Sequence, residues 1–418
     1  MSSESTVGVS TTPATSPSTP RLGLTQVVIC SAVIIAMSLG VRHGFGLWLQ
    51  PITLERGWSR ETFAFAIAVQ NLAWGAAGPL AGMVADRFGS FRVLVVGTLL
   101  YMAGLILMGV SNSVLGFTGS AGLLIGMAQA GTTYSIIFGI IGRNVAPEKR
   151  AWAMGVTAAA GSFGQFLMVP VESWLIGGFG WQNALFVLGC ASIIMIPLAF
   201  GLREEKRPYV PGTQSMTQAL KEAFAYKSFL LLMCGYFVCG FQVVFIGVHM
   251  PSYLKDKGMS PEVATYALAL IGLFNVIGTY LAGTLASRMP NRFILSGIYG
   301  LRSVVIVVFL LTPVSPLSVY IFAAFIGLLW LSTVPPTNSV IAGIFGVRYL
   351  SMLSGFVFFS HQIGSFMGVW LGGRLYDMTG SYDVVWWIAV ALGVAAALVN
   401  IPIREGAIHR PQPAVAPA

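Results

Sequence analysis

Twelve apolar segments separated by short polar gaps place the strongest constraint on how this chain folds. A helix that crosses the hydrocarbon core of a bilayer, roughly 30 Å thick, needs about 20 predominantly apolar residues. The pattern therefore predicts an all-α membrane protein with twelve transmembrane helices. The expected segments are 25–51, 61–84, 93–111, 116–141, 152–177, 182–201, 228–252, 263–285, 293–312, 316–341, 350–373 and 384–402.

The composition agrees with a chain whose surface mostly faces lipid. Of the 418 residues, 56% are hydrophobic and only 9% are charged, whereas a soluble protein carries about 25% charged residues. The net charge of +9 is spread over the gaps between apolar segments rather than gathered on one polar face. That distribution is typical of membrane topology, so we expect no nucleic-acid partner.

The longest gap, at 202–227, is rich in charged residues and divides the chain into two sets of six segments. The first twenty residues are rich in Ser, Thr and Pro and lack the basic start and apolar run of a signal peptide. We therefore predict five regions. They are a disordered cytoplasmic tail at 1–24, an N-terminal six-helix bundle at 25–201, a cytoplasmic linker at 202–227, a C-terminal six-helix bundle at 228–403 and a cytoplasmic tail at 404–418.

The distribution of Lys and Arg predicts the orientation in the membrane. With the N-terminus inside, sixteen of the 23 basic residues fall on the cytoplasmic side and five fall on the other side. Cytoplasmic loops carry an excess of Lys and Arg. Both termini are therefore expected in the cytoplasm.

A short motif follows the second segment and returns in weaker form after the eighth. Both copies run from a glycine to a charged or polar residue four positions on, and then to an arginine. Gly82 and Gly89 permit a tight turn, and Asp86 and Arg87 can form ion pairs between neighbouring helix ends. A solvated turn is the alternative interpretation. The positions concerned are Gly82, Asp86, Arg87, Gly89 and Arg92 in the first half, and Gly283, Ser287, Arg288 and Arg292 in the second.

Segment 82–92 resembles the cytoplasmic loop motif of the major facilitator superfamily, except that Phe91 stands at one basic position. With the twelve segments, this resemblance extends from Arg21 to Glu405. It implies the major facilitator fold of two six-helix pseudo-repeats, with a substrate site near the midplane between the halves. It also implies a conformational, gating role for the motif residues.

Two further segments, 40–48 and 358–366, are similar to bacterial members related to monocarboxylate porters and oxalate–formate exchangers. This resemblance implies a protein of the bacterial inner membrane. Animal monocarboxylate porters carry an Asp and Arg pair in the eighth helix. Aligned on Gly283, this chain has the uncharged Asn275 and Thr279 there. The identity of the substrate therefore does not carry over from the resemblance.

Three ionisable residues inside apolar segments are the main candidates for substrate contact, because a charge at the bilayer centre is costly and is rarely kept without use. Arg42 can bind a carboxylate through two parallel hydrogen bonds; its alternative is pairing with backbone carbonyls. Arg302 lies on a helix that is usually peripheral in this superfamily, so capping by carbonyls competes with a substrate role. His361 can titrate near neutral pH and donate to an anion, or it can be a satisfied core histidine.

Uncharged polar residues complete the expected substrate site. Each of them has an alternative role in hydrogen bonding between helices. The candidates are Tyr134, Gln165, Tyr236, Gln242 and Asn338. Pro335 and Pro336 interrupt the amide ladder of the tenth segment and predict a bend there.

Acidic residues are absent from the expected membrane centre, and Glu172, near the outer end of the fifth segment, comes closest. A positively charged core without acids favours an anionic substrate. We therefore expect a secondary transporter of small mono- or dicarboxylates that works by alternating access, through proton symport or anion exchange. In proton symport, His361 or the substrate itself would carry the proton.

Two alternatives remain open at this point: an exporter of neutral or acidic drug-like compounds, and a membrane sensor that transports nothing. No residue pattern predicts catalysis, a metal site or a cofactor. The lipid bilayer is the expected environment, and we expect a monomer.

Overall fold

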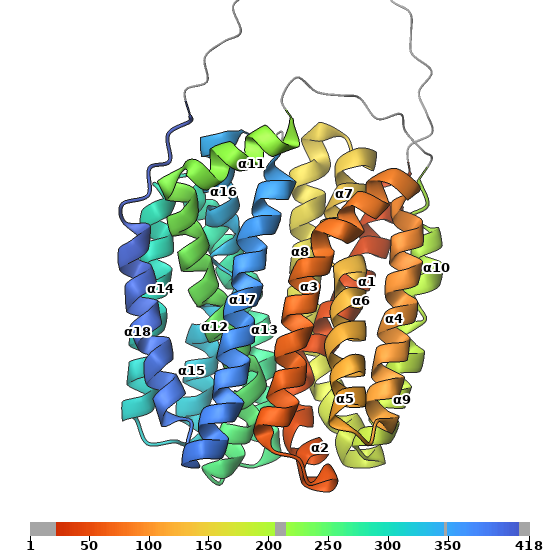
Figure 1. Ribbon diagram of the computed structural model, residues 1–418, viewed down its shortest axis with the longest axis vertical. Coiled ribbons are helices and arrows are strands. Elements are labelled where there is room, and N and C mark those ends of the chain that lie inside the picture. Colours follow the sequence, from red (N-terminus) through yellow and green to blue (C-terminus); the bar gives the residue numbers. More distant parts are fainter. Residues whose placement is uncertain (1–21, 205–214, 347–348, 409–418) are drawn as a thin grey trace, which may run out of the picture.

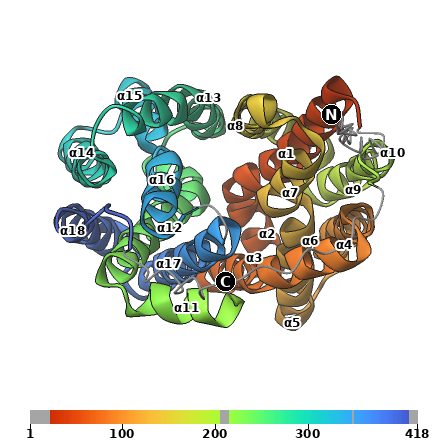
Figure 2. The ribbon, with the colours of Figure 1, turned by 90° about the horizontal axis from the view of Figure 1, so that it is seen from above.

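The computed structural model describes residues 22–204, 215–346 and 349–408, and these are almost entirely helical, with no strand among them. Their helices form two bundles side by side (Figures 1 and 2). We call the end of the molecule that carries residues 22 and 408 and the linker helix α11 (Met216–Ala225) the terminal end. The opposite end is called the distal end.

The N-terminal bundle begins with a continuous helical stretch made of α1, a 3-10 segment η1 and α2. Its fourth membrane segment is similarly composite, because a π-helical segment η2 and a break at Thr133 divide it. The elements are α1 (Leu24–His43), η1 (Gly44–Trp48), α2 (Leu49–Arg56), α3 (Arg60–Phe88), α4 (Ser90–Val110), α5 (Val114–Phe117), η2 (Thr118–Leu124), α6 (Ile125–Thr132), α7 (Tyr134–Asn144), α8 (Pro147–Phe179), α9 (Trp181–Ser192) and α10 (Met195–Phe200).

The C-terminal bundle follows the linker helix and is more regular, with one broken segment between α15 and α16. The break lies at residues 330–333, directly before the two prolines that predicted a bend. The elements are α12 (Lys227–Asp256), α13 (Pro261–Ala286), α14 (Asn291–Leu311), α15 (Pro316–Leu329), α16 (Val334–Phe345), α17 (Leu350–Thr379) and α18 (Asp383–Asn400).

Eleven helical stretches of the described residues are long and apolar enough to cross a membrane. The twelfth expected segment, 350–373, is the 30-residue helix α17, which lies in the same bundle. It falls outside that set because His361, Gln362 and several serines make it more polar than the others. The all-α membrane fold expected from the sequence is confirmed.

The turns before the second helix of each half show that the halves are structural repeats. Gly57 and Gly258 both have positive φ angles, 66° and 80°, which glycine adopts without steric cost. Two residues later, Ser59 and Ser260 are the N-caps of α3 and α13, with nearly identical backbone angles. Corresponding residues thus start corresponding helices, which extends the repeat beyond the loop motif.

The two halves meet along two seams, α3 against α17 and α8 against α13, which lie on opposite sides of the molecule (Figure 2). Near the distal end, a Cβ atom added to Gly373 would lie 2.7 Å from Cβ of Ala64. Midway along, one added to Gly75 would lie 2.9 Å from Cβ of Gln362. The two helices are therefore closely packed and antiparallel over this length.

The same antiparallel register would place Gly82 opposite Gly355, two turns nearer the terminal end. Neither glycine has any neighbouring atom within 4 Å of where a Cβ would stand. Since both lie on the helix faces that make contact farther along, the helices must diverge here. The α3–α17 seam, called the seam from here on, is closed at the distal end and opens toward the terminal end.

Candidate functional site

Arg42 lies at the seam near the end of α1, half-buried, with most of its hydrogen-bonding capacity unused. Its guanidinium donates to Oδ1 of Asn71 and lies over the ring of Trp74, with Cζ 4.9 Å from the ring centroid. Its Nε is buried and has no hydrogen-bond partner. No carboxylate among the described residues forms an ion pair with Arg42, so a permanent charge stands here without a protein anion.

A chain of aromatic contacts runs from Arg42 across the seam into the other half. Trp74 packs edge-on against Phe358, with ring centroids 5.1 Å apart. Phe358 stacks on His361 at 5.7 Å, and His361 contacts Tyr236 at 5.1 Å. Trp74 and Phe358 thus link Arg42 to His361 and Tyr236, three residues that the sequence selected separately.

Trp74 and Phe358 are the members of this cluster that the sequence did not select. Aromatic residues are common in apolar helices, and so neither stands out by itself. The available signal was spacing: Trp74 follows Asn71 by three residues and therefore lies on the same face of α3. Phe358 precedes His361 by the same interval on α17.

Gln165, on α8, lies at the α8–α13 seam, across the molecule from the α3–α17 seam, and Tyr134, on α7, packs against α8. The Tyr134 hydroxyl packs where a Cβ on Gly161 would stand, 2.7 Å away. Gln165 is buried against Gly272 of α13, and its Oε1 has no hydrogen-bond partner. Gln165 therefore offers an unused acceptor at the boundary between the halves.

Arg302 is 1% exposed and has a different environment, directed at the break between α15 and α16. Its Nε donates to the carbonyl of Leu329 at 3.0 Å, and its Nη2 donates to the carbonyls of Leu329 and Trp330. Its Nη1 contacts Cys239 Sγ at 3.3 Å. These carbonyls lose their helical partners at the break, and Arg302 replaces them. The arrangement favours the capping role over substrate contact.

Gln242 and Asn338 have partners within the C-terminal half. Gln242 donates to the carbonyl of Ala389 on α18 at 2.8 Å. Asn338 donates to the carbonyl of Val334 at 3.0 Å and accepts from Ser354 on α17 at 2.6 Å. These bonds fit the alternative role in helix packing.

Charged side chains hold the distal end closed. Arg60, at the start of α3, forms a two-pronged ion pair with Asp256 of α12, with distances of 2.6 and 2.7 Å. Glu61 pairs with Arg374 of α17 at 3.1 Å. Asp377 of α17 accepts from the backbone N–H groups of residues 60 and 61, and so caps α3 from the other half. The sequence could not reveal these pairs, because their members lie about 200 or 300 residues apart.

Backbone contacts reinforce this closure around η1. A Cβ on Gly46 would lie 2.4 Å from the carbonyl oxygen of Gly247. His43 makes a 3.0 Å hydrogen bond with the carbonyl of Leu268 on α13. The adjacency of His43 to Arg42 therefore reflects packing, while Arg42 points to a different part of the seam.

The loop motif lies at the terminal end. Gly89 has a φ of 92° and ends α3, as the predicted tight turn requires. Arg87 is exposed and lies over the ring of Phe88, and Arg92 is exposed on α4. The side chain of Asp86 lies outside the described set. In the second half, Gly283 lies next to Pro335 and Arg288 is exposed.

Glu172 is a buried acid, which the sequence did not predict; the prediction concerned the membrane centre only, and Glu172 lies toward the distal end of α8. Its side chain is 0% exposed, inside the N-terminal half, about two turns before the end of α8. One carboxyl oxygen accepts a 3.0 Å hydrogen bond from Trp48 Nε1, and the other has no partner. The apolar-segment count placed it near a membrane surface, but packing against η1 removes it from water.

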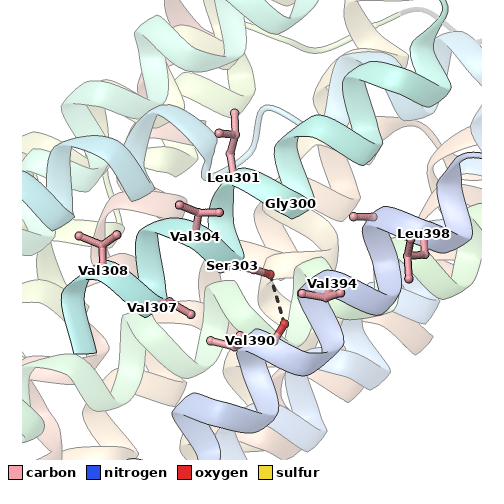
Figure 3. A pocket seen from close by; sticks show the side chains of 10 residues that line it. Gly300, Leu301, Ser303, Val304, Val307, Val308, Val390, Val394 and Leu398 are labelled. Atoms are coloured by element: carbon pink, nitrogen blue, oxygen red, sulfur yellow. Dashed lines mark hydrogen bonds between the residues drawn. The ribbon is translucent and has the colours of Figure 1, made fainter. Parts of the chain in front are cut away.

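A shallow groove between α14 and α18 lies on the outer face of the C-terminal bundle (Figure 3). Its lining is almost entirely aliphatic, with Ser303 bonded to the carbonyl of Val390 at 3.2 Å. Such a surface suits lipid tails and contains none of the polar residues of the seam. We therefore place the candidate site at the seam.

Comparisons with known proteins agree with this architecture. The chain is 23% identical to the uncharacterized MFS-type transporter YcxA of Bacillus subtilis, over 87% of this chain and 91% of the relative. It is 23% identical to monocarboxylate transporter 13 of Bos taurus, covering 90% and 89%. It is 24% identical to the oxalate:formate antiporter of Oxalobacter formigenes, covering 94% of each chain.

A solved structure of a bacterial homolog of the human lysosomal transporter Spinster superposes with a TM-score of 0.72. The superposition covers 90% of this chain and 96% of the other. At 15% identity it shows that the two proteins share a fold. The sequence profile of the Major Facilitator Superfamily matches residues 28–368. The chain is a multi-pass membrane transporter that belongs to the Major Facilitator Superfamily.

Proposed function

We propose that this transporter carries small organic anions, mono- or dicarboxylates, and that Arg42 binds the substrate carboxylate. The observation that supports this most is the unpaired guanidinium at the seam, with a single neutral hydrogen-bond acceptor and a buried, unpartnered Nε. A hydrogen bond between charged groups contributes about 1.5–3 kcal/mol. A carboxylate would provide the charge that Asn71 lacks.

The aromatic cluster supports the same proposal by limiting the size and shape of the ligand. Trp74, Phe358 and Tyr236 supply flat aromatic walls, and His361, whose Nδ1 makes a 3.1 Å hydrogen bond with Oε1 of Gln362, lies beside them in the opposite half. An anion held between Arg42 and His361 would contact both halves at once. Binding would thereby favour closure of the seam, as alternating access requires.

We propose that the terminal end faces the cytoplasm of a bacterial cell, on the strength of the Lys and Arg distribution. The seam in this structure would then be open to the cytoplasm and sealed toward the outside by the ion pairs of Arg60 and Glu61. The protein would act as a monomer in the inner membrane, by proton symport or anion exchange. The similarity to the monocarboxylate and oxalate:formate relatives supports this class of substrate. At 23% and 24% identity it supports no particular substrate.

Uptake into proteoliposomes tests the proposal. Purified protein would be reconstituted and offered radiolabelled formate, oxalate, lactate and pyruvate, with an imposed pH gradient or with unlabelled anion inside. We expect saturable uptake of at least one anion that the others inhibit. Transport of neutral or cationic dyes in the same vesicles, with no uptake of any carboxylate, would overturn the proposal.

A further inference from the structure

We infer that Asn275 is a positioning residue that makes the backbone of the break at residues 330–333 depend on contact with the N-terminal half. Its side chain lies on α13, is 0% exposed and joins three elements. The amide group donates a 3.0 Å hydrogen bond to Oγ of Ser162 on α8, in the other half. Its Oδ1 accepts a 3.0 Å hydrogen bond from the N–H of Leu331 in the break. The inference goes beyond the proposed substrate and holds whichever solute is carried.

The directions of these two hydrogen bonds fix the orientation of the amide. A backbone N–H can only donate, so the oxygen of Asn275 must face Leu331 and the NH2 group must face Ser162. Thr279, one turn further along α13, donates to the same oxygen at 3.2 Å. The amide is thus held on two sides, and a shift of the side chain toward α8 or away from it would change the hydrogen bond to the break.

Close backbone contacts place α13 directly between α8 and α15. One turn before Asn275, a Cβ on Gly272 would lie 2.7 Å from the backbone nitrogen of Phe166 on α8. One turn after it, a Cβ on Gly278 would overlap the carbonyl oxygen of Leu328 on α15. Because these two contacts leave no room for side chains, the helices stay close enough for one short amide to reach both neighbours.

Asn275 and Ser162 also lie where the α8–α13 seam begins to open. Nearer the distal end this seam is closed, and Thr265 makes a 2.9 Å hydrogen bond with Ser173 across it. Two turns from Ser162 toward the terminal end, Gly155 has no atom within 4 Å of where a Cβ would stand. The hydrogen bond to Ser162 therefore lies at the edge of the closed part, where a change in the angle between the halves would reach it.

The break has two kinds of support, one inside the C-terminal half and one that depends on the N-terminal half. Arg302 donates to two carbonyls at the break from α14, in the same half. The ring of Trp330, by contrast, contacts His43 of α1 edge-on, with ring centroids 6.0 Å apart. The N–H of Leu331 is linked to α8 through Asn275. The break is therefore placed to respond to how the two halves dock.

Hydrogen exchange measured by mass spectrometry tests this coupling without any substrate. Ser162→Ala removes the acceptor on α8 but leaves the oxygen of Asn275 available to the N–H of Leu331. We expect about two- to tenfold faster exchange in the peptide 329–336, as for the loss of one hydrogen bond. The two prolines of this peptide contribute no amide hydrogen, so the signal comes from the break.

Ser173→Ala is the matched control, because it removes a hydroxyl that α13 contacts across the same seam, nearer the distal end and away from the break. Exchange in the break should stay at the wild-type rate in this variant. Ser162→Thr restores a hydroxyl acceptor and should restore slow exchange. Equal exchange rates in the break of Ser162→Ala and Ser173→Ala would overturn the inference, and so would a failure of Ser162→Thr to slow the exchange.

A combined substitution separates coupling through Asn275 from a general loosening of the α8–α13 seam. Asn275→Ala removes both hydrogen bonds and should speed exchange in the break more than Ser162→Ala does. Adding Ser162→Ala to Asn275→Ala should then cause no further increase, because the serine acts through Asn275. A further increase as large as that in the wild-type background would overturn the role of Asn275. Should Asn275→Ala fail to fold, the comparison of Ser162→Ala with Ser173→Ala decides alone.

Discussion

Arg42 and Arg302 are both arginines within apolar segments, one in each half, yet their surroundings differ in every respect that matters for function. Arg302 donates to two backbone carbonyls and contacts Cys239, and it is completely buried. Arg42 has one side-chain acceptor, a tryptophan ring and an unused donor. The position of a charged side chain inside the membrane thus indicates a role, and its hydrogen-bond partners distinguish a structural role from one in ligand binding.

The two arginines have different partners because only Arg302 lies beside a helix break. The break at residues 330–333 leaves carbonyls without helical partners, and in lipid such groups must be satisfied by the protein. Arg302 supplies donors for them, and Asn275 accepts from the N–H of Leu331 at 3.0 Å on the other side of the break. Beside Arg42 the chain stays helical, because α1 continues directly into η1, and Arg42 donates to Asn71 rather than to a freed carbonyl. We propose that its remaining donors serve a ligand.

Removing Arg302 should have the largest effect of the changes considered. Arg302→Met leaves the carbonyls of Leu329 and Trp330 buried without donors, at about 1–3 kcal/mol for each. We expect a clear fall in melting temperature and in the amount of folded protein, measured by fluorescence-detected size exclusion after heating. Arg302→Lys should retain part of the stability. A variant that melts like wild type but fails to transport would move Arg302 into the substrate site.

Replacing Arg42 should affect transport rather than folding. Arg42→Gln keeps a polar side chain beside Asn71 but removes the charge, at a cost of about 1.5–3 kcal/mol in anion binding. That corresponds to roughly a 10- to 150-fold loss of affinity. Initial uptake rates over a range of anion concentrations measure it, with Arg42→Lys as the charge-preserving control. Unchanged uptake by Arg42→Gln would remove the contrast between the two arginines.

Weakening the distal closure should produce a smaller effect. Asp256→Asn removes the charge that Arg60 pairs with, and partly exposed pairs contribute up to about 1 kcal/mol. We expect more open protein in spin-label distances across the distal end. Asp383→Asn, at the same end, is the control, because Asp383 forms no ion pair with the N-terminal half among the described residues. Equal responses of the two variants would show that the ion pair does not hold the seam.

Asn338→Ala should change least. The hydrogen bonds of Asn338 to Val334 and Ser354 stay within the C-terminal half. The substitution should therefore lower the free energy of unfolding by about 1 kcal/mol. The anion concentration for half-maximal uptake should not change. A large rise in that concentration would show that the C-terminal half supplies a ligand that the contacts do not reveal.

The sequence predicted the apolar segments well, because membrane thickness fixes helix length, and it selected Arg42, His361 and Tyr236. It anticipated both roles for Arg302 but could not decide between them, since the carbonyls it caps come from residues 27 and 28 positions later. The ion pair of Arg60 and Asp256 spans 196 residues and depends on how the halves dock. The burial of Glu172 depends on the 3-10 segment η1, which no local pattern predicted.

The most direct test of the account is the shift in melting temperature that a carboxylate produces in purified wild-type and Arg42→Gln protein. A ligand at 100 times its Kd stabilises the folded state by about 2.7 kcal/mol. We predict equal melting temperatures without ligand, and a rise with the transported anion that needs roughly 10- to 150-fold more anion in Arg42→Gln than in wild type. An equal rise in Arg42→Gln would contradict the assignment of the substrate site to Arg42.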